Sequence, residues 1–276
     1  MDYYSNKLAL VTGGSSGIGL GIATELVKSN AHVVILARNK TTLNQALHEL
    51  ETHRVTSDQK ITALQADVTQ RSSLTDRLNE FVEQNGVPDI VVNSAGVAHP
   101  GTFTSLKPEI FDWMMDVNYF GTVNVLKVLV PGMKKRKSGT IVNISSVAGF
   151  IGVYGYTAYG ASKFAVAGFS DALRAELRLY GIQVSVVYPP DTQTPQLEYE
   201  SKIKPFITKQ IAGSTNPMTT QQVAREIIKR VARKKYLVLP GAEAKFLYSA
   251  NNLVGRFLFP IMDLLAKFAI RKVKLG

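Results

Sequence analysis

Short apolar runs alternate with longer amphipathic segments along this chain. Seven runs rich in apolar residues predict buried strands, at residues 8–11, 32–37, 61–65, 89–92, 139–144, 184–188 and 236–239. Segments with the spacing of amphipathic helices lie between them, at about residues 20–29, 41–53, 71–84, 108–135, 159–180 and 219–233. This regular alternation predicts a doubly wound, mostly parallel α/β sheet.

Two segments do not follow the alternation. Residues 196–217 have no clear period, which predicts an irregular and mobile flap. Near the C-terminus, Ile261, Leu264, Leu265 and Phe268 have helical spacing with charged residues between them, which predicts a basic amphipathic helix. Without an internal repeat or a low-complexity linker, we expect one domain over residues 1–240 and a C-terminal amphipathic extension over residues 241–276.

The amino-acid composition limits the kinds of catalytic and metal-binding sites that the chain can form. The chain has 276 residues, no cysteine, and four histidines without the spacing of metal ligands. Disulfides, thiolate metal sites and a cysteine nucleophile are therefore excluded, and we expect no metal site. The N-terminal residues lead directly into the first strand, so we expect no signal peptide. No run reaches the ~18 apolar residues of a membrane-spanning helix.

The net charge of +11 is concentrated near the C-terminus. Residues 225–276 contain 12 Lys and Arg against 3 Asp and Glu, whereas the preceding 224 residues contain 20 against 18. A nearly neutral body argues against a nucleic-acid groove and against nucleic acid as a partner. The basic amphipathic helix favours contact with an anionic membrane surface, so we expect a peripheral protein at the cytoplasmic face of a membrane or in the cytoplasm. The alternatives are a helix packed on the body or in an oligomer interface.

Tyr159 and Lys163 carry the first chemical signal. Their spacing places both side chains on one face of a helix, one turn apart. A phenol normally titrates near pH ~10, and a neighbouring ammonium favours the phenolate. The pair therefore makes a tunable proton donor and acceptor, although Tyr-x-x-x-Lys alone is usually structural. Ser145 and Ser146 follow a predicted strand upstream, and the spacing to Tyr159 favours Ser146 as the serine that faces the site.

A glycine-rich turn follows the first strand. Thr12–Gly19 contains glycines at 13, 14, 17 and 19 and leads into a helix. Glycine allows positive φ and close approach of a phosphate, and the helix offers unpaired N–H groups. At the end of the second strand, Arg38 stands where a carboxylate would bind the ribose 2′-hydroxyl of NAD. A guanidinium suits the 2′-phosphate of NADPH instead, and the alternative is a solvated loop arginine.

Polar or small residues also follow the next strands. Asp67 could accept a hydrogen bond from an adenine amino group or could cap a helix. Asn93–Gly96 ends in small residues that allow a flat ring or ribose to pass. Asn118 stands in the middle of a predicted helix, where asparagine is unfavourable unless its amide has a function; the alternative is a buried side chain satisfied by neighbouring backbone. Pro189–Pro195 follows the sixth strand and forms a rigid polar turn.

Together these motifs resemble the short-chain dehydrogenase/reductase family, in their order along the chain. The resemblance covers about residues 7–240 and implies a Rossmann-type fold of about seven strands, NADPH as cofactor, and a homodimer or homotetramer. It implies that Tyr159 is the proton donor, that Ser146 donates to the substrate carbonyl, that Lys163 lowers the pKa of Tyr159, and that Asn118 holds a water for proton resupply. The cofactor residues that it implies are Gly13, Ser15, Ser16, Gly17, Ile18, Arg38, Asp67, Val68, Asn93, Ala95, Gly96, Tyr159, Lys163, Pro189, Thr192 and Thr194.

Within the family, two strings resemble one branch. Phe150–Tyr159 and Tyr188–Pro195 are similar to the branch that reduces 3-ketodihydrosphingosine. The resemblance implies that the substrate is a long-chain keto sphingoid base. Rival readings are reduction of a steroid or fatty-acyl ketone, a cofactor-binding module without turnover, and a nucleic-acid binder. The complete set of serine, tyrosine and lysine argues against the module without turnover.

Overall fold

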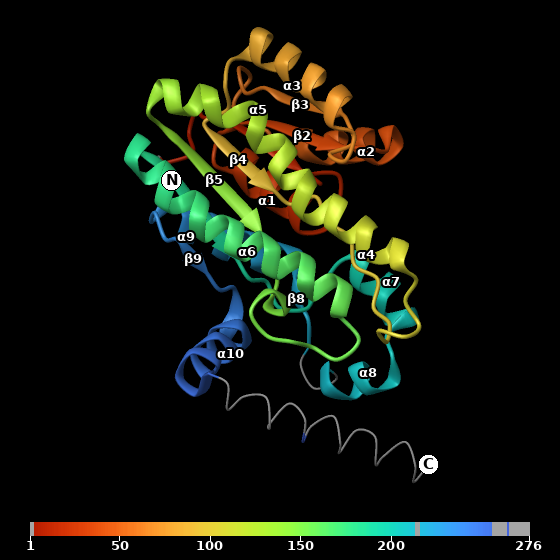
Figure 1. The fold of residues 1–276 in the computed structure, drawn as a ribbon. Coiled ribbons are helices and arrows are strands. Elements are labelled where there is room, and N and C mark those ends of the chain that lie inside the picture. Colours follow the sequence, from red (N-terminus) through yellow and green to blue (C-terminus); the bar gives the residue numbers. More distant parts are fainter. Residues whose placement is uncertain (1–2, 213–215, 256–263, 265–276) are drawn as a thin grey trace.

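A seven-stranded parallel sheet forms the centre of the protein (Figure 1). The computed structural model describes residues 3–212, 216–255 and 264. The sheet has the order β3-β2-β1-β4-β5-β6-β9, and every pairing in it is parallel. Its strands are β1 (Leu8–Thr12), β2 (His32–Ala37), β3 (Ile61–Gln65), β4 (Ile90–Asn93), β5 (Gly139–Ile144), β6 (Ile182–Val187) and β9 (Leu237–Val238). The predicted doubly wound sheet is confirmed.

Helices cover both faces of this sheet (Figure 1). One face is covered by α1 (Gly17–Lys28), α2 (Lys40–Glu51) and α9 (Thr220–Ala232), and the other by α3 (Arg71–Asn85), α5 (Gly121–Arg136) and α6 (Thr157–Leu177). The N-termini of α2 and α9 are fixed by side-chain caps. Asn39 accepts a hydrogen bond from the Thr42 N–H, and Thr219 and Gln222 form a capping box.

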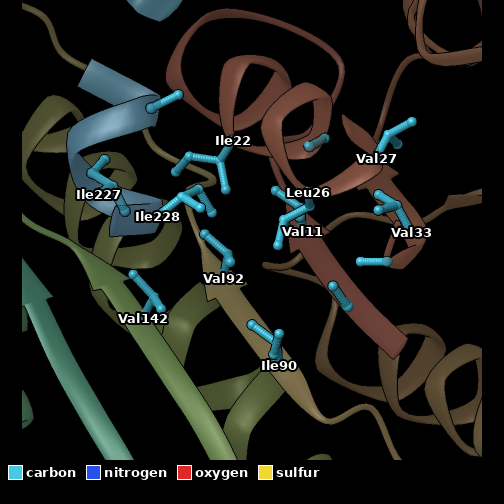
Figure 2. Packing of buried hydrophobic residues seen from close by; sticks show 14 of the residues in the cluster. Val11, Ile22, Leu26, Val27, Val33, Ile90, Val92, Val142, Ile227 and Ile228 are labelled. Atoms are coloured by element: carbon cyan, nitrogen blue, oxygen red, sulfur yellow. The ribbon is translucent and has the colours of Figure 1, made fainter. Parts of the chain in front are cut away.

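The two hydrophobic cores follow from the alternation of side chains along the strands. In β1, Ala9 and Val11 belong to the core under α1 and α9, whereas Leu10 belongs to the core under α3 and α5. Figure 2 shows the first core, in which Ile22 and Leu26 of α1 lie close to β1 and β4. Because both faces are covered, the strands are apolar at successive positions, as in other buried parallel sheets.

The predicted long helix over residues 108–135 is present, but it contains an irregular turn. It begins as α4 (Pro108–Met115), passes through one π-helical turn over Asp116–Phe120, and continues as α5. The π-helical turn holds Asn118, which is buried. Such turns often occur at functional sites because the extra residue redirects side chains.

The expectation of an irregular flap over residues 196–217 is wrong. This segment contains α7 (Pro195–Ile203) and α8 (Phe206–Ala212). Thr194 caps α7 by accepting from the Leu197 N–H, and Pro195 occupies the first turn, where its missing N–H does no harm. A small parallel pair, β7 (Thr192–Gln193) and β8 (Met218–Thr219), joins the two ends of the segment. The helices form because these caps and the tertiary contacts compensate for a weak apolar pattern.

The described part of the C-terminal extension is a helix, α10 (Gly241–Val254). Its Tyr248 ring lies 5.1 Å from the Phe150 ring and 6.0 Å from the Tyr188 ring, between centroids. The amphipathic pattern at Ile261, Leu265 and Phe268 lies outside the described residues. Within the described part of the chain, no helix is both long and apolar enough to cross a bilayer.

The strand order fixes where a ligand can bind. The chain proceeds outward from β1 to β3 and then returns to the other side of β1 with β4. At this reversal, the loops after neighbouring strands diverge to opposite faces and leave a crevice at the carboxyl ends. The loops after β1, β4, β5 and β6 therefore meet at one edge of the sheet.

Candidate active site

The loops after β1 and β4 are in direct contact. Thr12 Oγ1 accepts hydrogen bonds from the N–H groups of Ser94 and Ala95, both at 3.1 Å. Gly13 has φ +65°, and a Cβ there would lie 2.8 Å from the Ala95 backbone. Only glycine fits this position, for reasons of both conformation and space. The result is a rigid floor of backbone at the carboxyl ends of two central strands.

The glycine-rich turn also suits a phosphate. Gly17 has φ +54° and begins α1, whose first turn contains no acidic residue. The N-terminus of a helix carries unpaired N–H groups and a positive partial charge, which favour an anion. A Cβ at Gly17 would lie 3.2 Å from Thr194 Cγ2, so the turn also borders the segment after β6.

On one side of this turn lies a cavity of about 180 Å³. Its wall includes Arg38 and Asn39 after β2, and Asp67 and Val68 after β3. Asp67 Oδ1 accepts from the backbone and hydroxyl of Thr69, at 2.9 and 2.8 Å, while Oδ2 lies 3.8 Å from Arg38 Nη1. The Arg38 side chain is 57% exposed, so this long contact leaves its guanidinium free to bind another anion.

On the other side lies a larger cavity of about 310 Å³. Ser146 and Tyr159 line it together with residues from the turn after β6 and from α7 and α10. Apolar side chains line much of its wall, from Ile151, Val153, Leu197 and Leu247. This cavity combines an apolar wall with a few polar groups, as small-molecule sites generally do.

Tyr159 and Ser146 meet in this cavity. Tyr159 is in the first turn of α6, and Ser146 ends the segment after β5. Burial raises the pKa of the Tyr159 phenol, the negative charge of Glu200 raises it further, and a hydrogen bond with Ser146 opposes both effects. Ser145 also lines the cavity, but its hydroxyl donates to the Lys163 carbonyl at 2.9 Å. Ser146 is thus the serine that the structure places beside Tyr159.

Lys163 lies one turn beyond Tyr159 on the same face of α6. Its Nζ lies 5.7 Å from the centroid of the Tyr159 ring and donates to the Ile144 carbonyl at 3.0 Å. Only 5% of the residue is exposed, and burial lowers the pKa of its amine to about 8, against an opposing effect of Glu200. Burial and the charge of Glu200 dominate the pKa of Tyr159 and raise it, and the expectation that Lys163 lowers this pKa stays a prediction.

The Asn118 side-chain amide makes three internal hydrogen bonds. Its Oδ1 accepts from the Val97 N–H at 2.8 Å, and its Nδ2 donates to the Val97 carbonyl at 3.0 Å and to Ser162 Oγ at 2.8 Å. The amide therefore ties the loop after β4 to α6, and the expectation that Asn118 holds a water stays a prediction. A Cβ at Gly96 would lie 3.2 Å from Asn118 Oδ1 and 3.3 Å from Lys163 Nζ, so this glycine lies between the two.

A hydrogen-bond chain supports the strand ends. Asn93 Nδ2 donates to Asn143 Oδ1 at 2.8 Å, and Asn143 Nδ2 donates to Ser170 Oγ at 2.9 Å. Asn93 Oδ1 is the one buried side-chain polar atom of the described residues that has no hydrogen-bond partner. Buried acceptors are normally satisfied, so this oxygen at the end of β4 is an exception among the described residues.

Comparison with known proteins identifies the family. The short chain dehydrogenase family matches residues 7–204. A 3-ketodihydrosphingosine reductase of Bos taurus is 38% identical over 241 residues, 87% of this chain and 73% of the relative. A 3-dehydrosphinganine reductase of Danio rerio is 40% identical over 221 residues, 80% of this chain and 67% of the relative. The chain belongs to the short-chain dehydrogenase family.

A solved structure agrees with this assignment. A short-chain dehydrogenase from Sphingobium yanoikuyae in complex with NADPH matches with a TM-score of 0.77 and 25% identity, over 92% of this chain and 95% of that chain. The residues of the present short-chain dehydrogenase also fit a dinucleotide. Gly13 leaves no room for a Cβ, α1 begins beside it without an acidic residue, and Arg38 borders the smaller cavity.

The structure brings most of the sequence-predicted residues to one edge of the sheet. The smaller cavity is lined by Gly13, Ser15, Arg38, Asp67, Val68, Ala95 and Gly96, and the larger by Ile18, Ser146, Tyr159, Pro189, Thr192 and Thr194. Ser16, Gly17, Asn93, Asn118 and Lys163 lie in adjoining elements and do not line either cavity.

Sequence reasoning missed a charged group in the larger cavity. Tyr156, Asp191, Glu200 and Lys204 line its wall, and the Tyr156 hydroxyl donates to Glu200 Oε2 at 2.6 Å. Glu200 and Lys204 were hidden in the segment that was expected to be an irregular flap. A carboxylate on the buried face of a predicted helix would have indicated Glu200. The apolar pattern of α7 is too weak to predict that helix from the sequence.

Proposed function

We propose that this short-chain dehydrogenase reduces 3-ketodihydrosphingosine to dihydrosphingosine with NADPH, a step of sphingolipid biosynthesis. The observation that carries the proposal is the identity of 38% over 87% of the chain to a relative that is named for this reaction. The cavity supports it, because a serine and a tyrosine able to act on a carbonyl lie beside an apolar wall. An apolar wall suits a long-chain lipid ketone.

The residues of both cavities would hold the cofactor. Those of the glycine-rich turn would contact the pyrophosphate, Arg38 the 2′-phosphate, and Asp67 and Val68 the adenine. The residues that would contact the riboses and the carboxamide are Asn93, Ala95, Gly96, Tyr159, Lys163, Pro189, Thr192 and Thr194. Bound NADPH would supply the hydride that reduces the ketone carbon.

The protein side chains would donate the proton and stabilise the negative charge that develops on the substrate oxygen. Because its pKa is raised, the Tyr159 phenol keeps its proton at neutral pH, which is the state that a donor to the substrate oxygen needs. Ser146 would donate a second hydrogen bond to that oxygen and stabilise the charge that develops on it. The buried Lys163 amine, with its pKa of about 8, would add positive charge on the same side of α6.

The test is NADPH oxidation with 3-ketodihydrosphingosine in mixed micelles. We expect turnover by the wild type and a loss of about 10²- to 10⁴-fold in Tyr159→Phe, which removes the proton donor. Tyr154→Phe is the matched control, because Tyr154 is exposed and does not line the cavity. Turnover of a steroid or simple ketone in place of the sphingoid base would keep the reductase and reject the proposed substrate.

We further propose that the protein binds the cytoplasmic face of a membrane peripherally, where a sphingoid base resides. The support is local to α10, on which Phe246 is 72% and Leu253 is 89% exposed. Glu243 and Leu247 of the same helix line the larger cavity, so lipid could enter from this side. Exposed apolar side chains on a surface helix favour contact with a bilayer surface, and the excess of 12 Lys and Arg over 3 Asp and Glu in residues 225–276 favours an anionic one.

Flotation with phosphatidylserine vesicles tests this membrane proposal. The double variant Phe246→Ser/Leu253→Ser should lose most of its binding, whereas Phe103→Ser, which changes an exposed phenylalanine far along the chain, should not. Equal flotation of all three proteins would reject a role of α10.

We also propose a homodimer or homotetramer, which light scattering after size-exclusion chromatography would test.

A further inference from the structure

A carboxylate is buried in the wall of the larger cavity. The Glu200 side chain is 9% exposed, and it points its two oxygens at neutral donors. Oε2 accepts from the Tyr156 hydroxyl at 2.6 Å, and Oε1 accepts from Gln196 Nε2 at 3.1 Å. Burial raises the pKa of this carboxyl group, and the hydrogen bond from Tyr156 opposes the effect. The neutral hydrogen-bond donors around Glu200 thus stabilise its charge without neutralising it.

The cation nearest to Glu200 is shared with another carboxylate. Lys204 Nζ lies 4.0 Å from Glu200 Oε2 and 3.5 Å from Asp191 Oδ2. The charged side chains that line this cavity in the described part of the chain are Asp191, Glu200, Lys204 and Glu243, which are three carboxylates and one amine. In a protein with a net charge of +11, this is a local excess of negative charge. Such a cavity favours a cationic ligand.

Glu200 also lies close to the reacting groups. The ring of Tyr156, its hydrogen-bond partner, lies 5.6 Å from the Tyr159 ring between centroids. The charge of Glu200 raises the pKa values of both Tyr159 and Lys163, so its field reaches the proton donor. A cation held by Glu200 would therefore be adjacent to the carbonyl that Tyr159 protonates.

The substrate proposed above carries such a cation. In 3-ketodihydrosphingosine, the amino group is bonded to the carbon next to the ketone carbon, so the ammonium and the reacting carbonyl must bind side by side. We propose that Glu200 binds the ammonium of the substrate and so makes the enzyme selective for 2-amino ketones over ketones that lack the amino group. This inference rests on the proposed function and names the group that determines its specificity.

Physical chemistry explains why this group discriminates strongly. A buried carboxylate without a full counter-charge is unfavourable, and a substrate ammonium supplies that charge where water is excluded. An analogue without the amine leaves the carboxylate uncompensated and loses this interaction. Gln196 and Tyr156 hold the carboxylate in place before the substrate arrives, so little side-chain freedom is lost on binding.

The experiment compares two substrates in the full-length enzyme with NADPH. One is 3-ketodihydrosphingosine, and the other is the same long-chain 1-hydroxy-3-ketone without the amino group. We expect Glu200→Gln to lower kcat/KM for the amino ketone by about 30-fold or more, mainly through KM, and to change that for the other ketone by less than about threefold. Glu198→Gln, an exposed carboxylate on the same helix, should leave both values unchanged.

A conservative variant separates charge from folding. Glu200→Asp keeps the carboxylate at a shorter reach and should retain part of the selectivity, and melting curves would confirm that both variants fold. An equal fall for both ketones, or unchanged selectivity in Glu200→Gln, would overturn the inference while leaving the reductase intact. If the wild type reduces neither ketone, the proposed function itself is wrong and the inference falls with it.

Discussion

Replacement of Lys163 by methionine should stabilise the cofactor-free protein while it abolishes turnover. The amine is almost completely buried, and burial lowers its pKa from 10.5 to about 8. At ~1.4 kcal/mol per pKa unit, the charged form therefore costs about 3 kcal/mol of folding free energy at pH 7. The hydrogen bond to the Ile144 carbonyl, lost in the variant, offsets about 1 kcal/mol of this. We expect a net gain in the free energy of unfolding of about 2 kcal/mol.

The pH dependence of this gain identifies its cause. Below pH 8 the amine is protonated in both the folded and unfolded states, so the wild type carries the full penalty. Between about pH 8 and 10.5 the folded amine is neutral while the unfolded one still binds a proton, so the stability of the wild type rises with pH. The advantage of Lys163→Met should therefore shrink from about 2 kcal/mol at pH 7 to near zero at pH 10.

Urea denaturation followed by circular dichroism at pH 7 and pH 10 measures this difference. Lys127→Met, on the exposed face of α5, is the matched control and should show no comparable change. An advantage of the same size at both pH values would show that methionine simply packs better than lysine. A variant less stable than the wild type at pH 7 would refute the assigned penalty for the buried charge.

Two further predictions concern the cofactor. Arg38→Ser should raise the KM for NADPH by about 10- to 100-fold with little change for NADH, because one charge-assisted contact to the 2′-phosphate is lost. Equal losses with both coenzymes would place Arg38 outside the phosphate site. Arg77→Ser, which changes an exposed arginine of α3, is the control. Gly96→Ala should lower kcat by about tenfold with a small change in melting temperature, because its Cβ would lie 3.2 Å from Asn118 Oδ1 and 3.3 Å from Lys163 Nζ and would displace the amine by a few tenths of an ångström; a large loss of stability with unchanged kcat in the folded fraction would contradict this.

The sequence predicted the sheet well because its signal is local. Each strand between residues 8 and 187 appears where an apolar run predicted it, within a few residues. Burial on both faces makes these runs apolar at successive positions, and the pattern survives without knowledge of neighbours. The long helix was also predicted, but its π-helical turn at Asn118 was not, since an added residue in a helix leaves little trace in the periodicity.

The prediction failed where structure depends on distant contacts. The segment over residues 196–217 has few apolar residues in register, yet it contains α7 and α8. The Thr194 cap starts α7, and the pairing of β7 with β8 ties both ends of the segment together. Neither effect is visible as a hydrophobic period, so the sequence pattern predicts an irregular loop where the structure has a weakly amphipathic helix.

In the candidate site, too, the features that depend on local sequence were the ones that could be predicted. Spacing along one helix was enough to pair Tyr159 with Lys163, and the position of the glycine-rich turn between strand and helix was enough to predict a phosphate site. These relations are local, because one turn of helix or one strand end contains all the residues involved. The preference for Ser146 over Ser145 as the serine beside Tyr159 also required only the distance along the chain to Tyr159.

The sequence by itself thus determined the alternating strands and helices up to residue 187, the class of reaction and the cofactor class. Only the tertiary structure decided what surrounds that chemistry. The Asn118 amide joins Val97 to Ser162, and burial together with the charge of Glu200 from α7 raises the pKa of Tyr159. The physical reason is that burial and the electric field at a group depend on every side chain folded around it, many residues away along the chain. A local pattern records what a segment can form, whereas the pKa of its groups is a property of the whole fold.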